Sequence, residues 1–312
     1  MPAPDVSVVI ATYNRSAVLR EVLDVLRLQT VRTWEAIVVG DGCTDDSADV
    51  VAAFGDPRLR FVNLDRNHGE QSAPNNAGVS LATGRALAFL NHDDFWRPDH
   101  LERSLAHLDA TGADLVYSWI ANLLPGEDET VVLLGVSPGG VYTPAAIVPA
   151  SSWVMRRELA GRVGPWRSGW TIRLSPSQDW LWRAAKLGAQ LRELPRVSVI
   201  GFPSGSRPGS YAASGAAEHA RWRARLQSDP AWPEAILTRY IRTQADGGRL
   251  PPSARPARQV SWALRNAGSA AVASAGLHPL AVWTAIRHPG PGGFLTWLRK
   301  RRGLPARGSR MT

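Results

Sequence analysis

Apolar and polar positions along the first 112 residues follow two different periods. Short runs of β-branched and aliphatic residues, typical of buried strands, alternate with longer segments in which apolar residues return every three or four positions, as in helices. The run 6–10 is such a strand, and residues 14–29 are predicted to form a helix. Further strands are predicted at 35–39, 59–64 and 86–90, and further helices at 45–54, 73–82 and 98–110.

Strands and helices that alternate through short loops form βαβ units. The sequence therefore predicts an α/β fold with a mostly parallel central sheet flanked by helices. Ligands bind such sheets at the carboxyl ends of the strands. Polar clusters follow three of the predicted strands, at 12–15, 41–42 and 91–94. We therefore expect these clusters to meet in one site.

The pattern changes after residue 112. Short strands at 115–119 and 131–134 are mixed with Gly and Pro, and a helix is predicted at 178–187. A linker rich in Gly, Ser and Pro runs over 201–209. We predict two parts, a large α/β domain over 1–210 and a helical, basic C-terminal region over 211–312.

The positive charge of the chain lies in its C-terminal part. Of 36 basic and 27 acidic residues, net +9, the segment 247–312 holds eleven basic residues and no acidic one. Residues 1–246, with 25 basic and 27 acidic residues, have a net charge of −2, which argues against a nucleic-acid partner. The segment 294–302 combines Trp and Leu with four consecutive basic residues and fits peripheral contact with an anionic membrane. A solubilising tail is the alternative.

Cysteine content and hydropathy bear on the compartment. The single cysteine, Cys43, excludes an intramolecular disulfide and a cysteine-based zinc site. The run 6–11 is too short for the core of a signal peptide, and the stretch 268–286 is too polar for a membrane-spanning helix. A cytoplasmic location is expected, with the inner face of the membrane as one variant of it.

Two adjacent carboxylates, Asp93 and Asp94, follow a hydrophobic strand, where they add little to packing. Mg²⁺ and Mn²⁺ prefer oxygen ligands and are often held by one or two carboxylates together with substrate phosphates. The pair predicts a divalent metal site, and capping of the next helix is the alternative. Because side chains alternate along an extended strand end, His92 is expected to point away from Asp93.

The two other clusters suit a nucleotide. Thr12, Tyr13, Asn14 and Arg15 place hydroxyl, amide and guanidinium groups at a helix N-terminus, as a base, ribose or phosphate requires. Helix capping by Asn14 is the alternative. Glycines on both sides of Asp41 allow close approach of the backbone to a ligand, and Asp41 can accept hydrogen bonds from a nucleobase.

The ordered set of motifs resembles the family 2 glycosyltransferases, which are inverting enzymes with the GT-A fold. The resemblance covers about residues 5–200. Its motifs are VSVVIATYNR (6–15), IVVGDGCTDDS (37–47), NHG (67–69), NNAG (75–78), LNHDD (90–94), SSWVMRRE (151–158), GPW (164–166) and QDWLWR (178–183).

The resemblance implies transfer of a sugar from a nucleotide-diphosphate sugar to a hydroxyl of a carbohydrate, lipid-linked or small-molecule acceptor, with Mg²⁺ or Mn²⁺ as cofactor. It assigns metal binding to Asp93 with help from Asp94, and the general base to Asp179. Both functions fit the chemistry, since a cation stabilises the departing diphosphate and a carboxylate takes the proton of the acceptor. The nucleotide contacts would be Thr12, Tyr13, Asn14, Arg15, Asp41 and Asn91.

These assignments require Asp93 and Asp179 to face one cleft. A helix cap and an i,i+4 ion pair with Arg183 are alternative roles for Asp179. Among the thirteen tryptophans, Trp170 and Trp180 are the best candidates for stacking on a sugar ring.

Three positions depart from the family pattern. Gly40 and Asn91 stand where the family often has acidic residues, and Asn75 stands where it often has Arg, which removes a cation near the diphosphate. Two alternative functions stay open. The first, a sugar-phosphate nucleotidyltransferase, is disfavoured because residues 11–15 contain no glycine. The second is a catalytically degenerate protein that binds a nucleotide sugar without transferring it.

Overall fold

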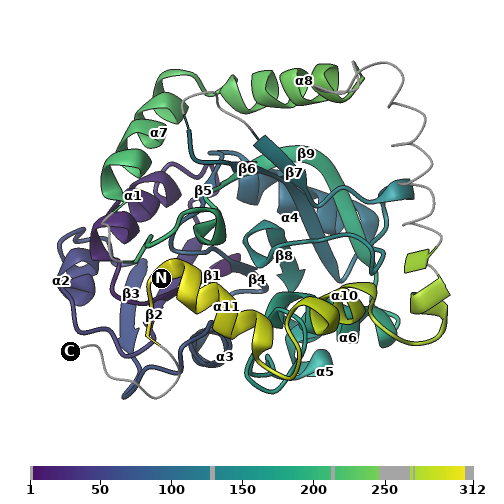
Figure 1. Cartoon of the computed structure of the whole chain (residues 1–312). Coiled ribbons are helices and arrows are strands. Elements are labelled where there is room, and N and C mark those ends of the chain that lie inside the picture. The colour runs from purple at the N-terminus through teal and green to yellow at the C-terminus, as the bar shows by residue number, and fades with distance from the viewer. Residues whose placement is uncertain (1–2, 127–130, 212–214, 246–267, 270, 306–312) are drawn as a thin grey trace.

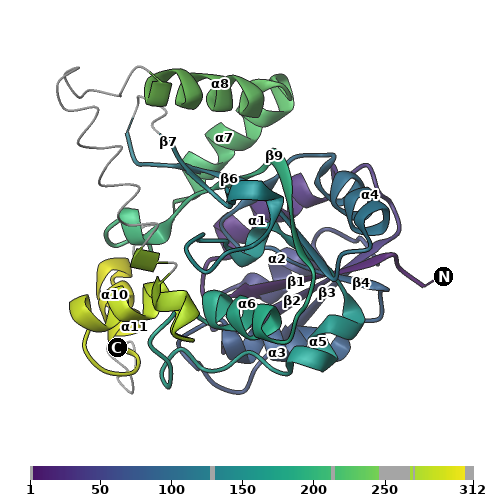
Figure 2. The ribbon, with the colours of Figure 1, turned by 90° about the vertical axis from the view of Figure 1, so that its right-hand side faces the viewer.

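The computed structural model describes residues 3–126, 131–211, 215–245, 268–269 and 271–305, and a mixed sheet lies at its centre with helices on both faces (Figures 1 and 2). The strands are β1 (Val6–Thr12), β2 (Trp34–Gly40), β3 (Leu59–Asn63), β4 (Ala86–Phe89), β5 (Phe95–Trp96), β6 (Leu115–Leu123), β7 (Val131–Leu134), β8 (Trp153–Arg156) and β9 (Leu191–Gly201). The helices are α1 (Ser16–Leu26), α2 (Ser47–Ala52), α3 (Ser72–Leu81), α4 (His100–Thr111), α5 (Arg157–Val163), α6 (Pro176–Lys186), α7 (Ala216–Ser228), α8 (Trp232–Ala245), α10 (Pro279–Arg287) and α11 (Gly293–Arg302).

The first half of the sheet is parallel, as the sequence predicts. The strand order is β3-β2-β1-β4-β8-β6-β9-β5, and β7 pairs with β6. Strand β1 pairs in parallel with β2 and β4, and β2 with β3. Beyond β4 the sheet becomes mixed, because β8 runs antiparallel to both of its neighbours while β9 is parallel to β6. The α/β class is confirmed, with a parallel and a mixed half.

The alternation of side chains in β1 divides the core into two layers. Val8 and Ile10 point to one face, where they pack with apolar residues of α1 and α4. Val9 points to the other face and packs with α3 and with the tryptophans around β8. Figure 2 shows α1 and α4 on one side of the sheet and α3, α5 and α6 on the other. A strand that is buried on both faces is apolar at nearly every position, as in 6–10. The exception is Ser7, which is buried and donates a hydrogen bond to Glu35.

Three tryptophans form the centre of the second layer. Trp153 and Trp166 stack with their ring centroids 5.5 Å apart, and Trp180 lies 6.2 Å from Trp166. The indole of Trp180 is buried and donates to the carbonyl of Gly164. The prediction that Trp180 stacks on a sugar is therefore wrong, because this ring is core material.

Local turn chemistry shifts the ends of several predicted elements. Helix α1 begins at Ser16 rather than at 14, because Asn14 has a left-handed backbone with φ of 46°. Its first amide, that of Ser16, donates to Asp45 from the loop after β2, so this cap comes from a distant segment. Strands β8 and β9 were not predicted. The first residue of the predicted linker, at 201, is the last residue of β9.

The C-terminal helices return to the α/β body. Helix α7 packs on α1, where Arg223 and Glu21 form an ion pair of 2.6 Å. Helix α11 crosses the sheet at the carboxyl ends of β1 and β4 (Figure 1). The division at 210/211 stays a prediction, and both of its parts contribute to one cavity. Residues 246–267 of the predicted C-terminal region lie outside the described residues.

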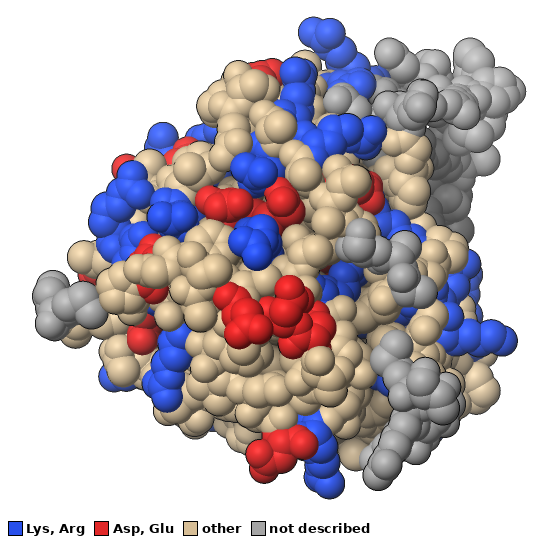
Figure 3. Space-filling model, turned by 90° about the vertical axis from the view of Figure 1, so that its left-hand side faces the viewer, with Lys and Arg blue, Asp and Glu red and all other residues tan. Residues whose placement is uncertain are grey.

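Charged side chains of both signs are interspersed on the face shown in Figure 3. This agrees with the near-neutral charge of residues 1–246 and differs from the single-sign stripe that a nucleic-acid surface shows. Among the described helices, none has both the length and the apolar character needed to cross a membrane.

The packing of α3 on β1 generates a stability prediction. A Cβ atom at Gly78 would overlap the side chain of Val9, which is fully enclosed. We expect Gly78→Ala to lower the free energy of unfolding by about 1–2 kcal/mol, since overpacking costs about 1–3 kcal/mol and the gain in helix propensity is smaller. Urea denaturation followed by circular dichroism measures this change.

Gly161 in α5 is the matched control, because a Cβ atom there meets no other atom within 4 Å. Gly161→Ala should leave stability unchanged or raise it by up to about 1 kcal/mol. Equal effects of the two substitutions would contradict direct packing of α3 on β1.

Candidate active site

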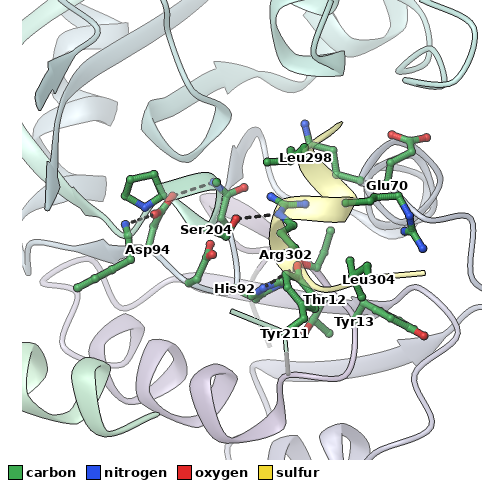
Figure 4. Close-up of a pocket in the computed structure, with 18 of the residues that line it drawn as sticks. Thr12, Tyr13, Glu70, His92, Asp94, Ser204, Tyr211, Leu298, Arg302 and Leu304 are labelled. Carbon is green, nitrogen blue, oxygen red and sulfur yellow. Dashed lines mark hydrogen bonds between the residues drawn. The ribbon is translucent and has the colours of Figure 1, made fainter. Parts of the chain in front are cut away.

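A cavity of about 460 Å³ opens at the carboxyl edge of the parallel half of the sheet (Figure 4). The loops after β1, β2 and β4 line it, together with the segment 202–206, Tyr211 and helix α11. Of the predicted site residues, the cavity is lined by Thr12, Tyr13, Asp41, Asn91, Asp93 and Asp94. Asn14, Arg15 and Asp179 are not among its lining residues.

The segment after β4 forms a turn, because the amide of Asp94 donates to the carbonyl of Asn91 at 3.2 Å. The turn brings His92 and Asp93 to the same cavity, so the expectation that His92 points away is wrong. The Nδ1 of His92 lies 3.0 Å from the carbonyl of Ala11, and Nε2 lies 3.4 Å from the hydroxyl of Tyr211. Burial lowers the pKa of His92 to about 4, so the ring is neutral, donating to Ala11 and accepting from Tyr211.

Asp94 is engaged within the protein. Its carboxylate accepts from the side-chain amide of Asn91 at 2.8 Å and from the backbone amide of Phe202 at 3.2 Å. Burial and the neighbouring carboxylate of Asp93 raise the pKa of Asp94 to about 7. Asp94 thus fixes the turn against the end of β9. Its carboxylate oxygens are therefore less available to a ligand than those of Asp93.

Asp93 is the open carboxylate of the cavity. Within the described part of the chain, its side-chain oxygens have no hydrogen-bond or ion-pair partner. Burial raises the pKa of Asp93, but His92, Arg15 and Arg302 outweigh it, so the net direction is downward. A charged, unpaired carboxylate facing a cavity is a suitable ligand for a hard divalent cation.

Asp41 organises the loop opposite Asp93. Its two oxygens accept from the backbone amides of His68 and Gly69, both at 2.9 Å. Burial raises the pKa of Asp41, while the two amides and Arg299 act in the opposite direction. Each carboxylate oxygen has two lone pairs, so Asp41 can still accept from a ligand.

Asn14 and Arg15 do not line the cavity but contact residues next to it. The amide oxygen of Asn14 accepts from the backbone of Thr44 at 2.8 Å, and its nitrogen donates to the hydroxyl of Thr44, so it joins the loops after β1 and β2. It does not cap α1, which was the alternative. Arg15 is buried, with its guanidinium 5.1 Å from the ring centre of Tyr211.

Asp179 lies in the first turn of α6 and makes the ion pair that its spacing suggested. One oxygen is 3.0 Å from Nε of Arg183, and the other is 3.7 Å from Arg167. The preceding residue, Gln178, donates to the carbonyl of Val148, next to Pro149 in the wall of the cavity. Asp179 is therefore close to the cavity wall without lining it, and its role as a base stays a prediction.

The sequence analysis missed the contribution of the C-terminal helix. Arg299 and Arg302 of α11 line the cavity, although their segment was interpreted only as a membrane-binding or solubilising tail. Their i,i+3 spacing, which places both on one face of a helix, was the available signal. Tyr211, between Arg15 and Arg302, was also missed.

Comparison with known proteins agrees with the geometry. The Glycosyl transferase family 2 profile matches residues 7–133. The succinoglycan biosynthesis protein ExoO of Rhizobium meliloti is 41% identical over 112 residues, which span 36% of this chain and 32% of that protein. The matched segment is thus about a third of this relative.

Two solved structures share the fold at low identity. TarS from S. aureus, in complex with UDP-GlcNAc, superposes with a TM-score of 0.55 at 18% identity, covering 96% of this chain and 92% of that one. The mannosyltransferase PcManGT from Pyrobaculum calidifontis, in complex with GDP-Man and Mn²⁺, gives 0.52 at 18% identity, covering 96% and 87%. The expected GT-A-like architecture is confirmed. The segment 7–133, which includes Thr12, Asp41 and Asp93 of the cavity, matches glycosyl transferase family 2.

Proposed function

We propose that the chain transfers a glycosyl group from a nucleotide-diphosphate sugar to an acceptor hydroxyl, with inversion at the anomeric carbon. The observation that carries the proposal is the unpaired carboxylate of Asp93 in a cavity that Thr12 and Asp41 also line. These residues come from the ends of three parallel strands, where nucleotides bind α/β sheets. The cavity has the volume of a small-molecule site.

The donor would lie along the strand ends. Asp41, with Tyr13 beside it, would take the nucleobase, and Thr12 and Asn91 the ribose, which places the diphosphate at Asp93. Support comes from the nucleotide sugars in the TarS and PcManGT complexes, whose folds resemble this one.

A divalent cation, Mg²⁺ or Mn²⁺, would be held by Asp93. The described residues contain no group of three or more His, Cys, Asp or Glu side chains arranged as a metal site. Binding would therefore depend on one carboxylate and the donor phosphates, as is common for Mg²⁺. The bound cation would supply positive charge to the departing diphosphate. The Mn²⁺ in the PcManGT complex supports this assignment.

Asp179 would accept the proton of the acceptor hydroxyl. Its partner Arg167 has a side chain that is 59% exposed, so it can move aside at little cost, whereas Arg183 is also anchored by the carbonyls of Val163 and Pro165. Movement of Arg167 would free one oxygen while Arg183 keeps the carboxylate oriented. A single base opposite the leaving group gives one displacement and hence inversion.

The first test measures release of nucleoside diphosphate from UDP-, GDP- and dTDP-sugars, with and without EDTA. We expect release from one donor class, its suppression by EDTA, and a loss of at least about 100-fold in Asp93→Asn, which weakens the cation site. Release of pyrophosphate from a sugar phosphate and a nucleoside triphosphate would instead identify a nucleotidyltransferase. Donor binding without turnover would identify a degenerate binding protein.

Asp179→Asn separates chemistry from binding. Because the amide cannot accept the proton, we expect transfer to fall by about 100- to 10,000-fold, with donor affinity in calorimetry within a factor of about three of wild type. Leu187→Ser, at an exposed position just beyond the same helix, is the control and should keep full activity. Normal transfer by Asp179→Asn would remove Asp179 from the mechanism.

We also propose that helices α10 and α11 contact an anionic membrane surface, at the cytoplasmic face, where a lipid-linked acceptor would lie. Large apolar side chains are exposed on both helices, among them Trp283, Ile286 and Trp297. Exposed cations stand beside them at Arg287 and Lys300. This combination is typical of interfacial helices.

Flotation with vesicles containing phosphatidylglycerol tests this contact. We expect the double substitution Trp283→Ser and Ile286→Ser to weaken binding by about threefold or more, because each side chain would lose apolar burial in the interface. Ile241→Ser on α8 is the control, since Ile241 is exposed away from these helices. If the position of the wild-type protein in the gradient is the same with and without the vesicles, the contact is excluded.

A further inference from the structure

Helix α11 forms one wall of the cavity and carries a cation into it. The guanidinium of Arg302 donates from Nε to the hydroxyl of Ser204 at 2.9 Å and lies 5.5 Å from the ring centre of Tyr211 (Figure 4). No other hydrogen bond of its side chain occurs among the described residues, so its two terminal nitrogens are available to a ligand.

The position of this helix is fixed by contacts at several points. The amides of Gly209 and Tyr211 donate to the last carbonyls of α11, those of Arg301 and Arg302, at 2.8 and 3.1 Å. Also in the last turn of the helix, Arg299 donates to the carbonyl of Gly69 at 2.9 Å. The segments 67–69 and 203–211 are thus tied to one helix. Arg302 is held in place before a ligand arrives.

Two guanidinium groups lie near Asp93. Arg15 and Arg302 lie near the same Tyr211 ring, at 5.1 and 5.5 Å, and both influence the carboxyl of Asp93. Within the described part of the chain, neither guanidinium has a carboxylate within 4.0 Å. Two cations therefore lie near Asp93 without a close ion pair, in a cavity that Asp41, Glu70 and Asp94 also line. Of the two, Arg302 lines the cavity, so its charge is available to a phosphate group there.

We propose that Arg302 binds the diphosphate of the nucleotide donor and stabilises it as the leaving group. This inference rests on the proposed function of the same cavity. The bond between the anomeric carbon and the diphosphate oxygen breaks, and its electron pair stays on that oxygen. The acceptor oxygen forms the new bond, and its proton passes to Asp179. The charge that develops on the diphosphate lies opposite the planar guanidinium, which suits two parallel hydrogen bonds to phosphate oxygens.

Arg299 has a different role on the same helix face. Its side chain is occupied by the carbonyls of Gly69 and Pro305, and Gly69 also donates to Asp41. Arg299 is therefore a positioning residue for the loop that Asp41 holds, and it leaves the diphosphate to Arg302.

The experiment measures binding of UDP, GDP and dTDP, and of the corresponding nucleosides at millimolar concentration, by calorimetry to full-length protein. For the diphosphate that wild type binds best, we expect Arg302→Gln to weaken affinity by about 10- to 100-fold, the usual loss for a charge-assisted hydrogen bond. Affinity for the nucleoside should stay within about twofold. Lys300→Gln is the control, because it removes the same charge from an exposed position on α11.

Three outcomes would overturn the inference. Unchanged diphosphate affinity in Arg302→Gln removes the contact, and tighter binding shows that α11 obstructs the site. An equal loss in Lys300→Gln shows a general effect of charge. If wild type binds none of the three diphosphates, the proposed function fails as well, which distinguishes the two failures.

Arg302→Lys covers the case in which Arg302→Gln does not fold, as judged by its melting curve. Lysine keeps the charge but loses the planar pair of donors. We expect diphosphate affinity about threefold to tenfold below wild type, with nucleoside affinity unchanged. Equal affinity of Arg302→Lys and wild type for the diphosphate would contradict the paired contact.

Discussion

The site depends on the hydrogen bonds of one buried carboxylate, that of Asp94. It ties the turn after β4 to the amide of Phe202 at the end of β9, so it joins the parallel and mixed halves of the sheet. The segment that follows Phe202 then carries Ser204 and Tyr211, which hold α11 and Arg302. An unpaired buried carboxylate is costly. The hydrogen bonds of Asp94 therefore specify one geometry for the turn, and that geometry turns Asp93 into the cavity.

The different roles of the neighbouring carboxylates of Asp93 and Asp94 follow from this constraint. Asp94 uses its oxygens within the protein and has a raised pKa, while Asp93 has no such partner among the described residues and has a lowered pKa. Two adjacent acids thus acquire different properties from burial and from their surroundings. Asp41 stands between these extremes, since it accepts two backbone amides and still has lone pairs toward the cavity. The chemistry we propose uses this difference, with one acid structural and one open to a ligand.

The sequence predicted the parts of the structure that local pattern determines. Periodicity located β1 to β4, and the rule that ligands bind at strand ends brought Thr12, Asp41 and Asp93 to one place before any coordinates. Prediction from the sequence failed where contacts come from distant segments of the chain. The cap of α1 comes from Asp45, and the turn at His92 depends on bonds that its own strand does not reveal. Strand β9 contains Pro195 and charged residues, so its pattern did not stand out.

Helix α11 shows why composition alone misassigned the basic tail. Four consecutive cations look equivalent in a sequence, but a helix distributes them around its axis at about 100° per residue. Arg299 and Arg302 consequently line the cavity, while Lys300 faces outward. Trp297 lines the cavity as well, with 41% of its surface exposed. The inward pair is held over aromatic rings, with Trp170 near Arg299 and Tyr211 near Arg302. A membrane contact and a phosphate contact are therefore not competing explanations of this segment, because Lys300 is exposed to solvent while Arg302 lies in the cavity.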